Sequence, residues 1–477
     1  MKRLSHMITA RLTGISPRYL PFADAASVEL PMARLLRLSL FQVSVAIAIV
    51  LLNGTLNRVM IVELGVPSVI VAIMISLPLL FAPLRALIGH RSDTYRSAIG
   101  WRRTPFIWMG SLLQFGGLAI MPFALLILSG DTTGPAWIGV AGASLAFLLV
   151  GAGMHMTQTA GLALATDIAP ADTRPRVVAF LYVALLIGMV AASLVFGQLL
   201  GDFSQLRLIQ VIQGAAVFTM ACNIVALWKQ EHRAPERTAA SVVHPDFSEA
   251  WRAYRLDAGS MRALVALALG TAAFAMQDIL LEPYGGEILN LSVGETTALT
   301  GIFAIGNILG FVVAARQLAR GNDPYRLAGF GAAAGLLAFP AVIAAAPLVS
   351  AGLFRCGTLL IGFGAGLFAV GTLIAAMNQS KTERSGLAVG AWGAVQATAA
   401  GVAITLGASI RDAVAGLAAA GKLGPALDGP AVGYNAVYHF EIFLLLATLV
   451  AIGPLVRSAH SLEQKSSTKF GLAEFPG

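Results

Sequence analysis

The sequence predicts an all-α polytopic membrane protein with twelve transmembrane helices arranged as two six-helix halves. Apolar residues make up 57% of the 477-residue chain and charged residues only 12%, about half the charged share of an average soluble domain. Apolar runs of roughly 18–25 residues, each long enough to cross about 30 Å of hydrocarbon, recur along the whole chain. The polar residues are too few to cover a soluble surface of this size, so we expect the chain to lie in a bilayer.

Twelve such runs define the predicted spans. They lie at residues 36–60, 68–88, 105–128, 136–165, 177–200, 207–228, 263–284, 297–318, 327–349, 353–376, 387–410 and 435–456. The first run is too long for a secretory signal and lacks a small-residue cleavage site. The longest and most charged segment between spans divides the chain. The predicted units are a cytoplasmic N-terminal segment (1–35), an N-terminal six-helix bundle (36–228), a cytoplasmic linker (229–262), a C-terminal six-helix bundle (263–456) and a cytoplasmic tail (457–477).

The basic residues predict the orientation of these spans. All but five of the 32 Lys and Arg residues fall on the side that holds the N-terminus, the even-numbered loops and the C-terminus. The five exceptions are Arg58, Arg207, Arg355, Arg411 and Lys422. The positive-inside rule therefore places both termini in the cytoplasm, and residues 411–433 become an extracytoplasmic insertion. The net charge of +8 then reflects topology and attraction to anionic lipid headgroups, and we expect no nucleic-acid partner.

The sequence carries no enzyme signature. It contains no P-loop, HExxH or GxSxG motif. Its two cysteines, Cys222 and Cys356, lie within predicted spans and lack the spacing of a disulfide or a metal site. We therefore predict a protein that is not an enzyme and has no metal site of its own.

The loop after the second span carries a glycine, an aspartate and a basic pair. In "GHRSDTYRSAIGWRR" these are Gly89, Asp93, Arg102 and Arg103. The loop resembles the signature of the major facilitator superfamily (MFS), in which a carboxylate at a helix end caps backbone N–H groups and pairs with arginine. The basic pair comes later here than in the usual pattern, and ordinary positive-inside charge is the alternative explanation. Together with the two six-helix halves, the loop predicts an MFS-type 6+6 pseudo-symmetric architecture.

Longer segments are similar to one branch of the MFS. They include "LNGTLNRVMIVELGVPS", "ISLPLLFAPLRALIGHRSDTYRSAIGWRRTPFIWMG", "GMHMTQTAGLALATDIAPADTRPRVVAFLYVALLIGMV" and "AVGAWGAVQATAAG". These segments resemble the PucC/LhaA family, the bacteriochlorophyll-delivery branch of the MFS. The resemblance covers nearly the whole chain and is densest in the first half. Within the family, the chain looks more like the LhaA type, linked to the core antenna, than the PucC type, linked to the peripheral antenna.

The resemblance implies an assembly factor for a light-harvesting antenna complex in purple phototrophic bacteria. It implies that bacteriochlorophyll or a precursor is bound transiently. The implied partners are the antenna α/β polypeptides, bacteriochlorophyll-synthesis enzymes, the membrane-insertion machinery and membrane lipid. The implied location is the bacterial inner membrane, in its intracytoplasmic photosynthetic part. The alternative function is a proton-coupled MFS secondary transporter of a hydrophobic or tetrapyrrole-like small molecule.

Polar residues interrupt the fourth predicted span. In "VGAGMHMTQTAGLALATDIAP" (150–170), His155 shares a helix face with Gln158, Thr159 and Thr166, although Leu162 lies on the same line. A neutral imidazole can donate a nitrogen to the axial position of a chlorin magnesium. His155 and Gln158 are therefore candidate pigment contacts that face the central cavity. The alternative is an interhelical hydrogen bond that holds this span to a neighbour.

His439, in the first turns of the twelfth predicted span, is the other candidate pigment ligand. Glu441 follows two residues later. Positions i and i+2 do not share a helix face, so we do not expect these two residues to form one site.

Polar residues also gather where the first and seventh predicted spans end. Asn57 and Arg58 lie near the extracytoplasmic end of the first span. Arg58 is predicted to pair with Glu63 or with Glu282 of the seventh span as a gate between the halves, and interfacial snorkelling is the alternative. Asp278 and Glu282 are four residues apart on one predicted helix face. They are either the titratable pair of a proton-coupled transporter or an interfacial acidic cap.

Overall fold

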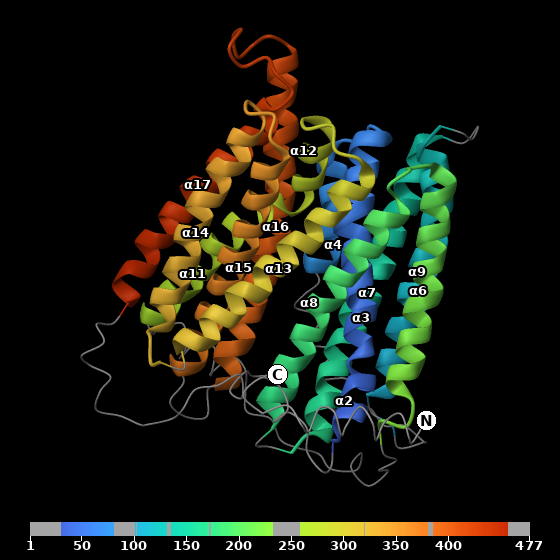
Figure 1. Cartoon of the computed structure of the whole chain (residues 1–477), viewed down its shortest axis with the longest axis vertical. Coiled ribbons are helices and arrows are strands. Elements are labelled where there is room, and N and C mark those ends of the chain that lie inside the picture. The colour runs from blue at the N-terminus through green and yellow to red at the C-terminus, as the bar shows by residue number, and fades with distance from the viewer. Residues whose placement is uncertain are drawn as a thin grey trace.

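Helices that run between the two ends of the molecule make up most of the computed structural model (Figure 1). The structure describes residues 30–80, 101, 103–130, 135–170, 173–231, 258–318, 320–379 and 385–456. Helices from the first part of the chain lie on one side in Figure 1, and those from the second part lie on the other.

The first part of the chain supplies six spans. The helices are α2 (Met32–Leu38), α3 (Leu40–Ile49), η3 (Val50–Leu56), η4 (Val59–Glu63), α4 (Ser68–Leu80), α6 (Thr104–Leu128), α7 (Ala136–Ile168), α8 (Arg174–Leu199) and α9 (Gln205–Leu227). The first four of these form one continuous span, Met32–Glu63.

The second part supplies the other six. The helices are α11 (Ala258–Ala275), η6 (Met276–Ile279), α12 (Leu281–Glu287), α13 (Val293–Leu318), α14 (Pro324–Ala345), α15 (Ala351–Gln379), α16 (Ser385–Ala419), α17 (Val432–Ile452) and η7 (Gly453–Leu455). Here α11, η6 and α12 follow one another as a single span, Met261–Glu287.

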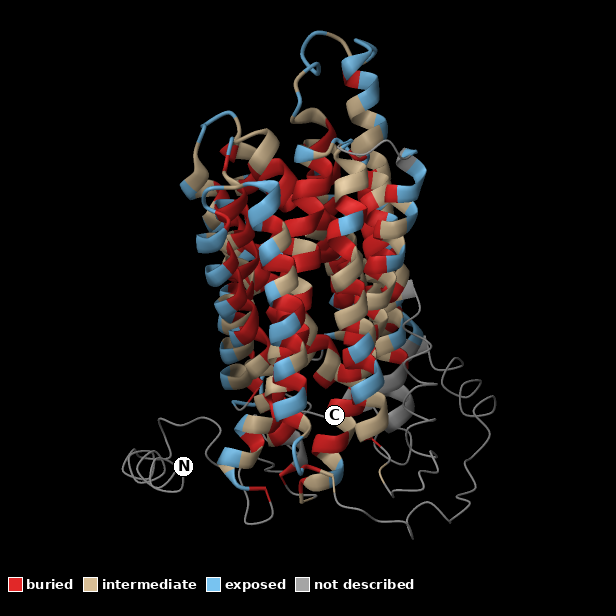
Figure 2. Ribbon diagram, turned by 90° about the vertical axis from the view of Figure 1, so that its right-hand side faces the viewer, coloured by how far each residue is buried: buried red, intermediate tan, exposed pale blue. Residues whose placement is uncertain are grey.

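The predicted class of twelve transmembrane helices is confirmed. Within the described residues, eleven helices are long and apolar enough to cross a membrane, and the shorter apolar helix Ser68–Leu79 occupies the predicted second span. Large apolar side chains point outward along the helices, among them Phe123, Leu337 and Val450, which are 67%, 71% and 73% exposed. Exposed positions follow the outer faces of the helices and buried ones fill the interior (Figure 2). Continuous apolar surface of this kind requires a lipid environment, so the chain is a multi-pass membrane protein.

The seventh span is not the continuous α-helix that the sequence predicts. α11 tightens into the 3₁₀ turn η6 and restarts as α12. Pro283 has no N–H for the carbonyl four residues before it, that of Ile279, and this carbonyl accepts instead from Asn57 Nδ2 at 3.3 Å. The N–H of Gln277 donates to Glu441 Oε1 at 2.8 Å. Side-chain partners thus replace helical bonds, and the prediction that Asp278 and Glu282 occupy one face of a regular helix is wrong.

α16 continues well beyond the predicted eleventh span. It extends to Ala419, so residues 411–419 of the predicted insertion prolong this helix. The helix and the turns after it project past the neighbouring helix ends, at the end of the molecule that holds α12 (Figure 1). We call this end the α12 end.

The two sides meet along two helix pairs. α8 packs on α13, and α4 packs on α16. Two hydrogen bonds join the second pair, from Thr405 Oγ1 to Ser76 Oγ at 3.0 Å and from the Val69 N–H to Asp412 Oδ2 at 2.8 Å. The first span crosses toward α13 and α12 at the α12 end, and this crossing creates the polar contacts described next.

Candidate functional site

The first span changes to wider turns where it meets the second half of the chain. η3 and η4 are π-helical, a rare geometry that frequently occurs at functional sites. Asn57 and Arg58 lie between them and are 0% and 5% exposed. An amide and a guanidinium are therefore held inside the protein, where each needs polar partners.

Asn57 connects the two halves at the break in the seventh span. Besides the Ile279 carbonyl, its Nδ2 donates to Glu282 Oε2 at 3.4 Å. Thr300 Oγ1 of α13 donates to the other oxygen of Glu282, Oε1, at 2.9 Å. Glu282 is only 4% exposed, so an interfacial acidic cap is the wrong description of this residue. The structure brings Asn57 and Glu282 together, while their role as a gate stays a prediction.

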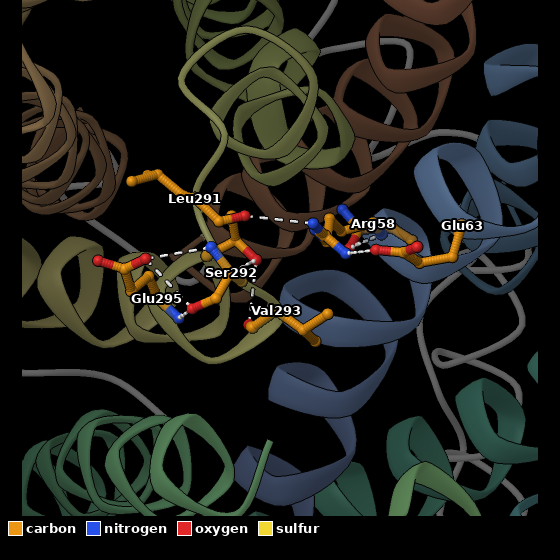
Figure 3. Close-up of polar contacts among 8 residues, drawn as sticks. Arg58, Glu63, Leu291, Ser292, Val293 and Glu295 are labelled. Carbon is orange, nitrogen blue, oxygen red and sulfur yellow. Dashed lines mark hydrogen bonds and ion pairs between the residues drawn. The ribbon is translucent and has the colours of Figure 1, made fainter. Parts of the chain in front are cut away.

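Arg58 pairs with Glu63 and reaches the second half through a backbone carbonyl (Figure 3). Its Nη1 donates to Glu63 Oε1, and its Nη2 donates to the Leu291 carbonyl at 3.2 Å. The guanidinium also lies against Gly286, where an added Cβ would come within 2.9 Å of Nε. Only 6% of the Arg58 side chain is exposed, against 37% for Glu63. The burial of Arg58 rules out the snorkelling alternative.

The loop that presents the Leu291 carbonyl is held by a capping box at the start of α13 (Figure 3). The Ser292 N–H donates to Glu295 Oε2 at 3.1 Å, and the Glu295 N–H donates to Ser292 Oγ at 3.2 Å. Such reciprocal bonds satisfy two of the free N–H groups at a helix start. Glu295 also binds Arg355 Nη2 at 2.9 Å, so the acceptor for Arg58 sits on a fixed segment.

Small residues bring the two halves into close contact beside this polar network. A Cβ added to Gly294 of α13 would lie 2.3 Å from the carbonyl oxygen of Gly197 in α8, and one added to Gly54 would lie 2.3 Å from Thr300 Oγ1. The Oγ1 atoms of Thr55 and Thr297 are 3.1 Å apart. The halves are therefore closed against each other at the α12 end.

A second ion cluster ties the base of the α16 extension to α12 and α17. Arg411 Nη2 lies 2.7 Å from Glu287 Oε2, and Tyr434 Oη donates to the same oxygen at 2.8 Å. The guanidinium carbon also sits 4.6 Å from the centre of the Tyr434 ring, and Nη1 binds Asp412 at 2.9 Å. The sequence marks Arg411 only as one of the few basic residues on the predicted extracytoplasmic side. No sequence pattern links it to Glu287 or Tyr434.

The break in the seventh span also receives a carboxyl group from α17. Glu441 is 0% exposed, and its Oε1 accepts the Gln277 N–H. Gln277 Nε2 donates to Asp278 Oδ1 at 2.6 Å. The sequence correctly separated Glu441 from His439, but it gave no sign that Glu441 joins the seventh span.

The structure places His155 and Gln158 among the helices of the first half. His155 is 9% exposed. The position one turn earlier, Gly151, faces Pro78 of α4, so His155 lies on the α4 side of α7. Gln158 Nε2 donates to Gln42 Oε1 of α3 at 3.4 Å, an interhelical contact of the kind that the alternative explanation requires. Pigment contact by either residue stays a prediction.

The cavities among the described residues include three of about 890, 130 and 550 Å³. The 890 Å³ cavity lies between α3, α8 and α9. Its wall is mostly apolar, with Gln198, Arg207 and Gln210 as its polar residues. Neither His155 nor His439 lines any of these three cavities.

His439 lies on the outer surface of α17. The residue is exposed, and its Nδ1 is 2.7 Å from the Asn435 carbonyl. Glu441 points to the interior instead, as the i, i+2 spacing predicts. His439 therefore faces away from the buried polar network, and its role as a pigment ligand stays a prediction.

Most of the predicted MFS loop, including Gly89, Asp93 and Arg102, lies outside the described residues. Arg103 is described, and its Nε donates to Asp167 Oδ2 at 2.9 Å. Glu231 Oε2 accepts the N–H of Thr104 at 2.8 Å at the start of α6. A carboxylate cap and a carboxylate–arginine pair are both present here, although Glu231 and Asp167 supply them, and the sequence did not identify either residue in that role.

Comparison with known proteins places the chain among membrane proteins of photosynthetic bacteria. The family model described as PUCC protein matches residues 55–460. Protein PucC of Rhodovulum sulfidophilum is 55% identical over 87% of this chain and 92% of its own length. A Rhodobacter capsulatus protein named for the puhA–bchM intergenic region is 53% identical over 98% of this chain and 100% of its own. The bacteriochlorophyll synthase 44.5 kDa chain of Rhodobacter capsulatus is 27% identical, with 80% and 87% covered.

Solved structures show the same fold at low sequence identity. A bacterial homologue of the iron transporter ferroportin, in its inward-facing state, aligns with a TM-score of 0.66. The alignment covers 90% of this chain and 99% of that one at 14% identity. The likeness confirms the predicted MFS-type architecture and carries no information about cargo.

Proposed function

Since this chain belongs to the PUCC protein family, we propose that it is an assembly factor for a light-harvesting antenna complex, specifically the core antenna, light-harvesting complex 1. The family match over residues 55–460 is the observation that carries the proposal. The 27% identity to a protein named as a bacteriochlorophyll synthase chain supports a link to bacteriochlorophyll. In this proposal the chain is not an enzyme: it holds the pigment, or a precursor, as cargo while antenna α/β polypeptides are assembled.

We place the chain in the photosynthetic inner membrane, next to the partners that antenna assembly requires. Those partners are the antenna polypeptides, bacteriochlorophyll-synthesis enzymes, the insertion machinery and membrane lipid. The direct experiment is mild solubilisation of the tagged full-length protein, followed by identification of the pigment and polypeptides bound to it. Co-purification of bacteriochlorophyll and antenna polypeptides would support the proposal, and a preparation free of both would refute it.

His155 is the residue at which pigment binding can be tested. A neutral imidazole can coordinate the chlorin magnesium, and His155→Leu removes the donor nitrogen while roughly keeping the buried volume. We expect pigment co-purification to fall while protein abundance holds, and His155→Gln to retain part of the pigment through its amide oxygen. If His155 is only an interhelical strut, leucine should cost about 0.6 kcal/mol or somewhat more of packing stability, and abundance should fall together with pigment.

Gln114→Leu is the matched control for this experiment. It removes an interhelical hydrogen bond from α6 to the Ser44 carbonyl of α3 but leaves the imidazole and Gln158 in place. Pigment lost equally from both variants would contradict a specific role for His155, and pigment retained in His155→Leu would exclude the residue as a ligand.

The orientation of the chain is part of the proposal and can be measured with reporter fusions. Because all but five Lys and Arg residues lie on one side, fusions after Lys229 and at Gly477 should report the cytoplasm. A fusion after Gly424, in the turns beyond α16, should report the extracytoplasmic side. A periplasmic signal at Gly477 would refute the proposed orientation.

A proton-coupled secondary transporter is the second candidate. Buried carboxyl groups in a membrane interior commonly mark proton pathways, and Glu282 and Glu441 are 4% and 0% exposed. Proton-dependent flux of a tetrapyrrole in liposomes, without antenna polypeptides, would favour this function.

A further inference from the structure

Three acidic side chains meet at the break in the seventh span. Asp278 and Glu282 flank the restart of the helix, and Glu441 reaches it from α17 through the Gln277 N–H. Gln277 bridges two of these acids, because its N–H donates to Glu441 Oε1 and its Nε2 donates to Asp278 Oδ1 at 2.6 Å. We call these three residues the acidic junction.

Among the described residues, no Lys or Arg side chain forms an ion pair with the acidic junction. Each ion pair among them uses other acids: Glu63, Asp167, Asp202, Glu287, Glu295 and Asp412. Arg58, next to Asn57, is held by Glu63, and Arg411 of α16 is held by Glu287 and Asp412. No group of three His, Cys, Asp or Glu residues in the described ranges could hold a metal ion. Three adjacent carboxylates without a countercharge would be very costly in a membrane interior.

Buried polar atoms at the junction remain without partners in the described structure. They are Oε2 of Glu441, Oε1 of Gln277 and the hydroxyl of Tyr438. Glu441 and Tyr438 are 0% exposed and Gln277 is 2% exposed. Tyr438 lies one helical turn before Glu441 and packs edge-on to Tyr284 at 5.6 Å. Unsatisfied atoms of this kind need an explanation. The Gln277 amide oxygen only accepts, so it can bond a carboxyl group only if that group carries a proton.

We propose that the acidic junction is a proton-binding site in which Glu441 carries the proton, and that release of the proton opens the α12 end. The coupling follows from shared contacts. Glu282 and the Ile279 carbonyl, both at the junction, are held by Asn57 of the other half. An ionised Glu441 must gain water, and the junction is closed to water while Asn57 holds it against the other half. Ionisation therefore favours separation of the halves. This inference does not depend on pigment binding.

The proton itself can be detected by infrared spectroscopy of the purified, pigment-free full chain. A protonated carboxyl group has a carbonyl stretch that a carboxylate lacks. Glu441→Gln should remove part of this band, and Glu441→Asp should retain it at a shifted position. The glutamine can still accept the Gln277 N–H, so both variants should fold, as monodisperse elution would verify. An unchanged band in Glu441→Gln would overturn the proposal.

Opening can be followed with cysteines at Thr55 and Thr297, whose hydroxyl oxygens are 3.1 Å apart across the halves. In a background with Cys222 and Cys356 changed to serine, a membrane-permeant oxidant should crosslink the pair when the α12 end is closed. With the native junction, the crosslinking yield should fall roughly threefold or more as the pH rises from mildly acidic to mildly alkaline. With Glu441→Gln, which mimics the protonated form, the crosslinking yield should stay high over the same pH range.

Asp202→Asn is the matched control, because it removes one acidic charge at the same end from an exposed ion pair with Arg207. It should leave the pH response intact. Variants are compared at each pH because thiol reactivity itself rises with pH. A yield that follows sodium concentration in place of pH would overturn the proton site in favour of a metal cation. A response equal in Glu441→Gln and the native junction would overturn the coupling, and neither result would bear on the pigment proposal.

Discussion

Gly294→Leu is expected to hold the two halves apart at the α12 end and to abolish function. A Cβ at this position would lie 2.3 Å from the carbonyl oxygen of Gly197 and 3.1 Å from Cα of Gly201. These are backbone atoms of α8 and of the turn that follows it, so no side-chain rotation can relieve the clash and the segments must separate. Forcing extra atoms into a packed contact typically costs about 1–3 kcal/mol. Crosslinking of cysteines at Thr55 and Thr297 should fall to background, and a strain carrying only this variant should lose the antenna complex.

Gly116→Leu provides the control for this prediction. It makes the same substitution inside helix α6, where a Cβ would meet nothing within 4 Å. Crosslinking and antenna levels should stay near those of the unmodified protein. If Gly294→Leu crosslinks as well as Gly116→Leu, the glycine contact does not determine closure.

Glu63→Gln is expected to destabilise the protein more than Arg58→Met, although both break the same ion pair. Removing Glu63 leaves a guanidinium whose side chain is only 6% exposed and which keeps the Leu291 carbonyl as its acceptor. Removing Arg58 leaves a carboxylate that is 37% exposed and can be hydrated. Leaving a buried charge without its partner costs about 3–5 kcal/mol, and the partial exposure of Glu63 lowers the cost on its side. Thermal unfolding of the purified variants should show this order.

Asp202→Asn, which breaks an exposed ion pair, is the control for the two variants of the Arg58–Glu63 pair. Asp202 lies 3.7 Å from Arg207 with both side chains largely exposed, and exposed pairs contribute about 0–1 kcal/mol. Its melting temperature should barely change. Equal destabilisation by Arg58→Met and Glu63→Gln would show that the burial of the guanidinium does not govern the energetics.

Much of the candidate site could be anticipated because polar residues inside apolar runs are costly and therefore informative. Asn57, Arg58 and Glu282 were identified in this way, and the structure joins Asn57 to Glu282 and Arg58 to Glu63. The break at Pro283 could have been expected from the missing N–H of proline. The partner of Gln277 could not, because Glu441 lies 164 residues further along the chain and no local pattern links the two.

The sequence by itself determined the membrane class, the number of spans and the similarity to one family. The physical reason is that each helix satisfies its own backbone hydrogen bonds and crosses the bilayer on the strength of its own apolar length. Only the tertiary structure decided which polar groups meet, that the halves close at Gly197 and Gly294, and that Asp278, Glu282 and Glu441 share one junction. Those contacts join helices that are remote in sequence, and in a membrane they depend on packing and interhelical hydrogen bonds, which the hydrophobicity of single spans does not encode.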